Sequence, residues 1–116
     1  MMKIYVCGPI SGYADYNLPA FDLAAKQLEG LGHAVINPCA LDGESERNLK
    51  WEDYLKRDLK LLVDCDAIFL LDNWHFSRGA MLEFYVATNL GLKFYFWDRF
   101  VSGHYEGDKR LYALHP

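Results

Sequence analysis

Two carboxylates stand at positions where the helical spacing of the sequence predicts an apolar face. Asp58 follows Tyr54 by four residues, in a segment whose large apolar side chains recur every three or four residues. Glu83 precedes Val86 by three residues in a second segment of the same kind. A carboxylate held against apolar surface costs free energy unless it is paired, hydrogen-bonded or protonated. Two of them in one short chain therefore indicate a site for nucleophilic or acid–base chemistry.

A simpler explanation exists for each carboxylate taken alone. Either one could cap nearby backbone N–H groups, and either could form an ion pair with Arg57 or Arg78. A shared site accounts for both positions at once, and we adopt it as the working hypothesis.

The first loop expected beside these carboxylates follows the predicted strand Lys3–Cys7. Its glycines let backbone N–H groups approach a ligand, which suits an anion. Glycine and proline in such a loop are also common for purely geometric reasons. The candidate binding residues of this loop are Gly8, Pro9, Ile10, Ser11 and Gly12.

The second loop follows the predicted strand Ala67–Leu71 and leads into a predicted helix. Ser77 is a good N-cap for that helix, and a helix start can equally bind a phosphate. Glu83 lies six residues after Ser77, roughly 9 Å along a helix, which suits a sugar phosphate with its anomeric carbon at the glutamate. Trp74 or Phe76 could stack on a base or simply cover the core. The candidate binding residues of this loop are Asp72, Trp74, Ser77, Arg78 and Gly79.

Strands and helices are expected to alternate along the chain. Runs rich in β-branched and aromatic residues predict strands over Lys3–Cys7, His33–Asn37, Ala67–Leu71 and Lys93–Trp97. Amphipathic spacing predicts helices over Phe21–Gly30, Trp51–Val63 and Ser77–Leu90. Apolar strands separated by such helices indicate an α/β fold with a parallel sheet covered on both faces. We expect a flavodoxin-like (Rossmann-like) doubly wound sheet of four to five strands in the order 2-1-3-4(-5), with its ligand site where strands one and three meet.

The composition fits a single domain, residues 1–116, in which residues 98–116 form a terminal arm or an edge element. A net charge of −4 argues against nucleic acid as a partner. The three cysteines include no CxxC pair, so neither a disulfide framework nor a zinc site is expected. We predict no metal site and no cofactor. The first residues contain only a short apolar run, so we predict no membrane span or signal peptide and expect a cytoplasmic protein.

Three motifs carry a resemblance to a known family. They are the opening KIYVCGPISG, the middle segment RDLKLLVDCDAIFLL and the late segment SRGAMLEFYVATNLG. Through them the chain resembles the nucleoside 2-deoxyribosyltransferase superfamily, and in pattern most of all its 2′-deoxynucleoside 5′-monophosphate N-glycosidase branch. The resemblance implies an enzyme that hydrolyses the N-glycosidic bond of a 2′-deoxynucleoside 5′-monophosphate through a glutamyl-deoxyribosyl intermediate.

The same resemblance implies roles for individual residues. Glu83 matches the nucleophilic glutamate, and Ser77 matches the serine that holds the 5′-phosphate in the hydrolases. Asp58, eight residues before Asp66, matches the acid/base aspartate. Tyr5 matches a strand-one tyrosine that lies near the sugar and the glutamate. The expected partner is therefore a small-molecule nucleotide or nucleoside.

The chain departs from the hydrolase pattern at the phosphate. Ser11 stands where the hydrolases have a phosphate-contacting arginine, a charge that Arg78 could replace. In the family a second phosphate-contacting serine comes from a neighbouring subunit, and Ser102 is the candidate here. This resemblance and the aromatic residues within 94–105 predict a homodimer or a higher homo-oligomer.

Other functions stay open at this point. Base exchange by a nucleoside 2-deoxyribosyltransferase would use the same glutamate. A non-catalytic nucleotide-binding or sensor domain would share the fold, although it has no need of two buried carboxylates. A receiver domain would need paired acidic residues after Lys3–Cys7, and a flavodoxin would need a Ser/Thr-rich phosphate loop there; the chain has neither.

Overall fold

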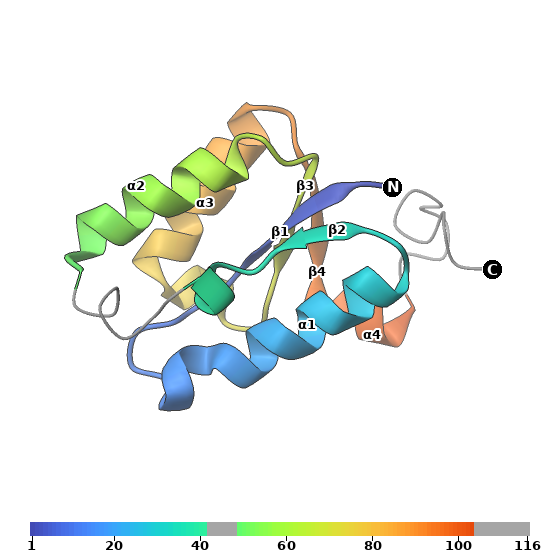
Figure 1. Ribbon diagram of the computed structural model, residues 1–116, viewed down its shortest axis with the longest axis horizontal. Coiled ribbons are helices and arrows are strands. Elements are labelled where there is room, and N and C mark those ends of the chain that lie inside the picture. The colour runs from blue at the N-terminus through green and yellow to red at the C-terminus, as the bar shows by residue number, and fades with distance from the viewer. Residues whose placement is uncertain (42–48, 104–116) are drawn as a thin grey trace.

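The protein is built on one parallel sheet of four strands (Figure 1). The computed structural model describes residues 1–41 and 49–103. The strands are β1 (Lys3–Cys7), β2 (Ala34–Ile36), β3 (Ala67–Leu70) and β4 (Lys93–Phe96). Each adjacent pair is parallel, and the order is β2-β1-β3-β4. The predicted flavodoxin-like α/β fold and the strand order 2-1-3-4 are confirmed.

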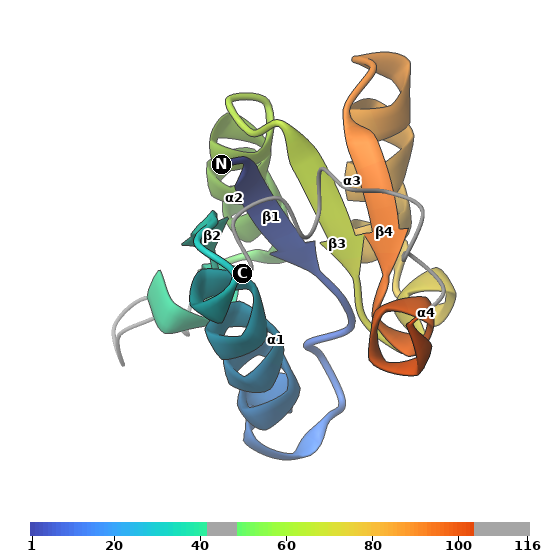
Figure 2. The same ribbon diagram turned by 90° about the vertical axis from the view of Figure 1, so that its right-hand side faces the viewer.

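Helices cover both faces of this sheet, as Figure 2 shows. They are α1 (Leu18–Gly30), α2 (Trp51–Leu62), α3 (Arg78–Asn89) and α4 (Trp97–Ser102). The helices α1 and α4 pack on one side of the sheet, and α2 and α3 pack on the other. Every residue of β3 is buried, as expected of a parallel strand enclosed between two layers.

The alternation of side chains along β1 decides which of them can reach the candidate site. Ile4 and Val6 belong to the core beneath α1, whereas Tyr5 and Cys7 belong to the core beneath α2 and α3. A tyrosine hydroxyl and a thiol are thereby placed on the side of the sheet from which Asp58 and Glu83 approach.

The carboxyl ends of β1 and β3 lie side by side, because Cys7 is in register with Leu70. Successive connections lead to opposite faces here, which is the switch point where such folds bind ligands. Gly8 follows β1 directly, and a Cβ at this position would lie 2.9 Å from Leu71 Cβ. The close approach of the two strand ends therefore requires glycine.

The chain beyond β4 differs from the expectation. The strand predicted for Lys93–Trp97 ends at Phe96, and α4 begins at Trp97 where an arm or an edge element was predicted from residue 98 onward. Packing explains this helix, because the rings of Trp97 and Phe100 lie 6.2 and 5.4 Å from the buried ring of Phe69. Residues 104–116 lie outside the described residues, so the rest of that prediction stays open. Across the two described ranges, no helix has the length and apolar character needed to cross a membrane.

Candidate active site

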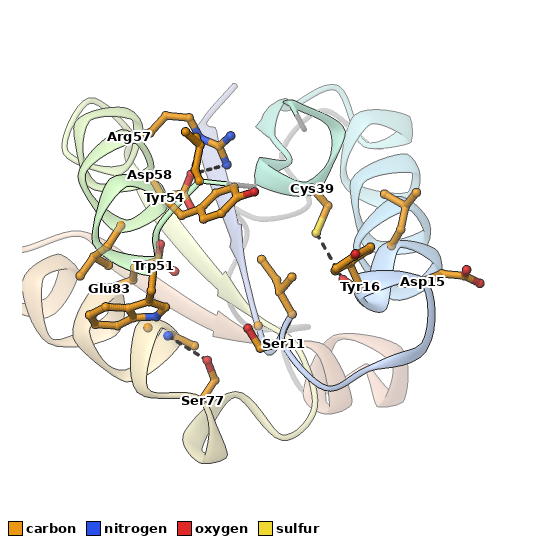
Figure 3. Close-up of a pocket in the computed structure, with 17 residues that line it drawn as sticks. Ser11, Asp15, Tyr16, Cys39, Trp51, Tyr54, Arg57, Asp58, Ser77 and Glu83 are labelled. Atoms are coloured by element: carbon orange, nitrogen blue, oxygen red, sulfur yellow. Dashed lines mark hydrogen bonds and ion pairs between the residues drawn. The ribbon is translucent and has the colours of Figure 1, made fainter. Parts of the chain in front are cut away.

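A cavity of about 300 Å³ opens at the carboxyl ends of β1 and β3 (Figure 3). Its walls come from the loop after β1, the segment before α1, the segment after β2, the inner face of α2 and the first half of α3. Both carboxylates singled out by periodicity line it. The lining residues are Gly8, Ile10, Ser11, Asp15, Tyr16, Leu18, Cys39, Leu49, Trp51, Tyr54, Leu55, Arg57, Asp58, Ser77, Gly79, Ala80 and Glu83.

Glu83 lies on the face of α3 that packs against the sheet, and its side chain is held from β1. Its exposed fraction is 7%. The hydroxyl of Tyr5 donates a hydrogen bond of 2.7 Å to Glu83 Oε2, and the thiol of Cys7 lies 3.4 Å from Oε1. Each oxygen of the carboxylate thus has its own donor, and both donors come from the same strand.

This setting changes the ionisation of Glu83. The pKa of Glu83 is raised from 4.5 to about 7. Burial is the largest cause and the nearby charge of Asp58 adds to it, whereas the hydrogen bonds from Tyr5 and Cys7 and the charge of Arg57 oppose the rise. Burial also raises the pKa values of the Tyr5 hydroxyl and the Cys7 thiol well above their ordinary values. Both groups therefore keep their protons and act as donors, while Glu83 can change its charge near neutral pH.

Asp58 lies on α2 with an exposed fraction of 6%. The Nε and Nη2 atoms of Arg57 each lie 2.9 Å from Asp58 Oδ1. The ion pair considered from the sequence therefore forms, and it forms inside the cavity wall. Arg57 also donates to the carbonyl oxygen of Pro38 at 3.4 Å, which fixes the guanidinium between two elements.

Ser77 is the N-cap of α3, and its Oγ accepts a hydrogen bond of 3.2 Å from Ala80 N. It also lines the cavity together with Gly79. A helix start carries free N–H groups and a partial positive charge, so this end of the cavity suits an anion. Capping and ligand binding, which the sequence left as alternatives for Ser77, are both compatible with its position.

The aromatic wall of the cavity comes from α2 and from the segment before α1. Trp51, Tyr54 and Tyr16 line the cavity. Trp74, one of the predicted binding residues, instead packs against the ring of Phe84 at 4.7 Å and is not among the lining residues. Its position fits the simpler role of covering the core.

The guanidinium of Arg78 lies over the ring of Trp51, 4.3 Å from its centroid. Arg78 is thus connected to the cavity through Trp51 and is not itself a lining residue. A Cβ at Gly79 would lie 3.6 Å from Trp51 Nε1, so the indole rests close to the first turn of α3.

The first loop contributes three of its five predicted residues to the cavity, Gly8, Ile10 and Ser11. Pro9 is buried, and its carbonyl oxygen accepts a hydrogen bond of 2.8 Å from Asn17. Gly12 has a φ of +83° at the turn, and Asp72 is exposed on the second loop. None of these last three lines the cavity.

Several residues that line the cavity or contact Glu83 were not predicted as site residues, and some of them carried a signal. Trp51 and Tyr54 precede Asp58 by seven and four residues, so the helical spacing that marks Asp58 marks them as well. Cys7 follows Tyr5 by two residues in a strand and so shares its face. Tyr16 gave no such signal, since it lies in a turn where its φ is 54° and no periodicity applies.

No group of three or more His, Cys, Asp or Glu side chains able to hold a metal ion occurs within residues 1–41 and 49–103. The buried acid groups that line the cavity are Asp58 and Glu83, and Glu83 has its donors in Tyr5 and Cys7.

Comparisons with known proteins agree with this architecture. Residues 2–96 match a family described as Domain of unknown function (DUF4406). No curated protein matches the chain. A solved 2-deoxyribosyltransferase from the psychrotolerant bacterium Bacillus psychrosaccharolyticus has a similar structure, with a TM-score of 0.65 and 24% identity over 81% of this chain and 70% of that one. That protein is described as a biocatalyst for the synthesis of antiviral and antitumoral nucleosides. The resemblance to this superfamily is confirmed at the level of the fold.

Proposed function

This chain belongs to the DUF4406 family of domains of unknown function, and we propose that it hydrolyses the N-glycosidic bond of a 2′-deoxynucleoside 5′-monophosphate. The observation that carries the proposal is the position of Glu83. Its carboxylate is held by the Tyr5 hydroxyl at 2.7 Å and faces a cavity that it shares with Asp58 and the start of α3. A buried nucleophile, a second carboxylate and an anion site are the parts that this reaction requires.

In the proposed reaction Glu83 attacks the anomeric carbon of the sugar. A carbon–oxygen bond forms, the bond from the anomeric carbon to the base nitrogen breaks, and its electron pair leaves with the base. Asp58 gives the base a proton. Water then attacks the anomeric carbon of the glutamyl ester, Asp58 takes a proton from that water, and Glu83 leaves as a carboxylate.

The two carboxylates need only one proton between them for this cycle. Glu83 has a pKa of about 7, raised in part by the charge of Asp58, so near neutral pH the two carboxylates can hold one proton between them. The productive form has the proton on Asp58 and the charge on Glu83. Loss of that proton at higher pH leaves the base without an acid to protonate it.

The phosphate and the base are proposed to lie at opposite ends of the cavity. Ser77 and the N–H groups at the start of α3 bind the 5′-phosphate, and the distance of roughly 9 Å from this helix start to Glu83 matches a sugar phosphate. Tyr54, one turn before Asp58 on α2, supplies a flat surface for the base. The small molecule that fits this arrangement is a nucleotide.

Base exchange is the second candidate function, because the similar solved structure is described as a 2-deoxyribosyltransferase. The first half of the reaction is the same. A second base, in place of water, would then attack the anomeric carbon of the glutamyl ester. A third possibility is a non-catalytic sensor domain, which would bind a nucleotide without cleaving it.

The test is to incubate the purified protein with the four common 2′-deoxynucleoside monophosphates and with the matching nucleosides, and to measure free base. We expect base release from at least one monophosphate, and we expect Glu83→Gln to lower it by several orders of magnitude because the nucleophile is lost. A second base added in excess separates the two enzyme functions, since only a transferase forms the exchanged nucleotide. Binding without base release by the wild-type chain would favour the sensor.

A further inference from the structure

The two oxygens of Glu83 are held by donors of very different strength. Oε2 accepts from the Tyr5 hydroxyl at 2.7 Å, which is a short and strong bond to a carboxylate. Oε1 lies 3.4 Å from Cys7 Sγ, and a thiol is a weak donor. The lone pairs of Oε1 are therefore more available for attack than those of Oε2.

The Cys7 thiol has a second acceptor within reach. Its sulfur lies 3.6 Å from the carbonyl oxygen of Ala80, one turn before Glu83 on α3. A buried donor that loses its partner costs free energy unless another acceptor takes over. Cys7 can turn from Glu83 Oε1 to the carbonyl oxygen of Ala80 without being left unpaired, whereas the Tyr5 hydroxyl donates to Glu83 Oε2.

The thiol is also suited to stay a donor throughout the reaction. Cys7 is fully buried, and burial together with the neighbouring Glu83 raises the pKa of its thiol well above the ordinary value. It therefore keeps its proton at any pH at which the protein works, and it does not compete with Glu83 as a nucleophile.

We infer that Cys7 is a positioning residue that aims Glu83 Oε1 at the anomeric carbon and releases it during attack. This inference rests on the proposed function. As Oε1 forms the new carbon–oxygen bond, the Cys7 thiol keeps its proton and its hydrogen bond changes acceptor, from Oε1 to the carbonyl oxygen of Ala80. Oε2 stays on the Tyr5 hydroxyl and becomes the carbonyl oxygen of the glutamyl ester.

Four groups face Glu83 and contribute to its ionisation. Tyr5 and Cys7 reach it from β1, and Asp58 and Arg57 act on it from α2. A test of Cys7 must leave the other three unchanged. It must also separate a hydrogen-bonding role from simple packing, because Cys7 is part of the core.

The experiment compares Cys7→Ser with Cys7→Ala. Serine is a stronger donor than cysteine, so it should lower the pKa of Glu83 by about half a unit to one unit, while alanine should raise it by a similar amount. The pKa is measured by carbon NMR of the protein labelled at the glutamate carboxyl groups, with Glu83→Gln to assign the signal. Cys65→Ser is the matched control, since Cys65 is a buried cysteine whose thiol donates to Leu61 and which does not line the cavity.

The kinetic part measures kcat for base release by the same variants. We expect Cys7→Ser to be about tenfold slower than wild type, because the hydroxyl holds Oε1 too firmly, and Cys7→Ala to lose about threefold or less. A packing role predicts no opposite pKa shifts. It also gives no reason for serine to be slower than alanine.

Opposite pKa shifts with the slower serine variant would support the inference. Shifts in the same direction, or a serine variant as fast as alanine, would overturn it. The NMR measurement needs no substrate, so it also separates two kinds of failure. If the wild-type chain frees no base, the proposed function fails, and so does the proposed switch of the Cys7 hydrogen bond during attack. Opposite pKa shifts in the two variants would in that case still show that Cys7 controls the ionisation of Glu83.

Discussion

At the scale of single residues, the burial of Glu83 has a consequence for stability. A carboxylate whose pKa rises from 4.5 to about 7 on folding favours the folded state only while it is protonated. Its contribution is fully present below pH 4.5 and is lost as the pH rises through about 7. A shift of this size corresponds to about 3 kcal/mol.

We therefore predict that Glu83→Gln is more stable than wild type above pH 7 by up to about 3 kcal/mol, and that the gain disappears below about pH 4.5. Glutamine keeps an oxygen for the Tyr5 hydroxyl and cannot ionise. Urea unfolding of both proteins at several pH values measures the difference. A glutamine variant that is less stable at pH 8 would indicate that the charge of Glu83 supports the fold.

The shared proton predicts a pH profile for turnover. If the productive form carries one proton on Asp58 and Glu83 together, kcat/KM should fall as the pH rises above about 7, because the pair then loses that proton. The phosphate of a nucleotide substrate itself titrates near pH 6 and so affects the rate on the acid side of the profile. A nucleoside substrate, which has no phosphate, is the control for this effect. A rate that rises through pH 7 to a plateau would contradict the shared proton and leave Glu83 as a nucleophile that works without an acid.

Ser77 is expected to set the choice between nucleotide and nucleoside. We predict that monophosphates are cleaved with a kcat/KM roughly 100-fold above that of the matching nucleosides, since the phosphate gains two or three charge-assisted hydrogen bonds. Ser77→Asp should shrink this ratio by repelling the dianion, and Ser77→Ala should shrink it less. Equal rates on both substrates in the wild type would move the chain toward the nucleoside transferases.

The site was predictable from the sequence where a repeating pattern placed a residue. Periodicity alone singled out Asp58 and Glu83, and the structure brings both to one cavity. It gave no signal for Tyr16, because a turn has no repeat. Trp74 was predicted to bind the base because it is aromatic and lies in the second loop. In the structure its ring packs against Phe84 and does not line the cavity.

At the scale of elements, α2 and α3 meet at the cavity through Trp51 and Arg78. The guanidinium stacks on the indole, and the indole lies against the first turn of α3. Such a cation–π contact contributes about 0.5–1 kcal/mol at an exposed site. It can fix the orientation of a ring that lines the cavity without taking part in the chemistry.

We predict that Arg78→Ala raises KM by about fivefold with little change in kcat, because Trp51 loses the contact that holds it in place. Arg78→Lys should restore part of the loss. The matched control is Arg99→Ala, which removes a similar stack on Phe96 away from the cavity. A large fall in kcat for Arg78→Ala would instead point to direct contact between Arg78 and the phosphate.

The elements themselves were predictable because strands and helices each have a characteristic apolar pattern. The strands appear where runs of β-branched and aromatic residues predicted them, and α1, α2 and α3 appear where helical spacing predicted them, with ends shifted by up to three residues, as at the start of α1. The helix α4 was missed because its first turn continues an aromatic run that reads as strand. Contacts of Trp97 and Phe100 with Phe69 are tertiary and leave no local pattern.

At the scale of the whole molecule, large apolar side chains remain exposed near α3 and β4. Phe76, Tyr85 and Phe94 expose 77%, 68% and 50% of their surface. Such side chains are commonly covered by a partner. A second copy of the chain is the partner that the family resemblance implies.

We predict a homodimer, or a dimer of two dimers, at micromolar concentration. Sedimentation velocity measures the mass directly, and replacing Phe94 with lysine should shift it toward a single chain if this surface is the interface. Val63→Lys is the control, since Val63 is exposed at the far end of α2. A mass of one chain for the wild type would contradict the prediction.

The parallel arrangement of the strands also decides how this protein can be attached to a support. All four strands start at one end of the sheet and reach the cavity end together, so Met1 lies at the end away from the cavity (Figure 1). Met1 is also largely exposed. A peptide tag or a resin joined there leaves the mouth of the cavity clear, so an immobilised preparation should exchange substrate and product as freely as the protein in solution.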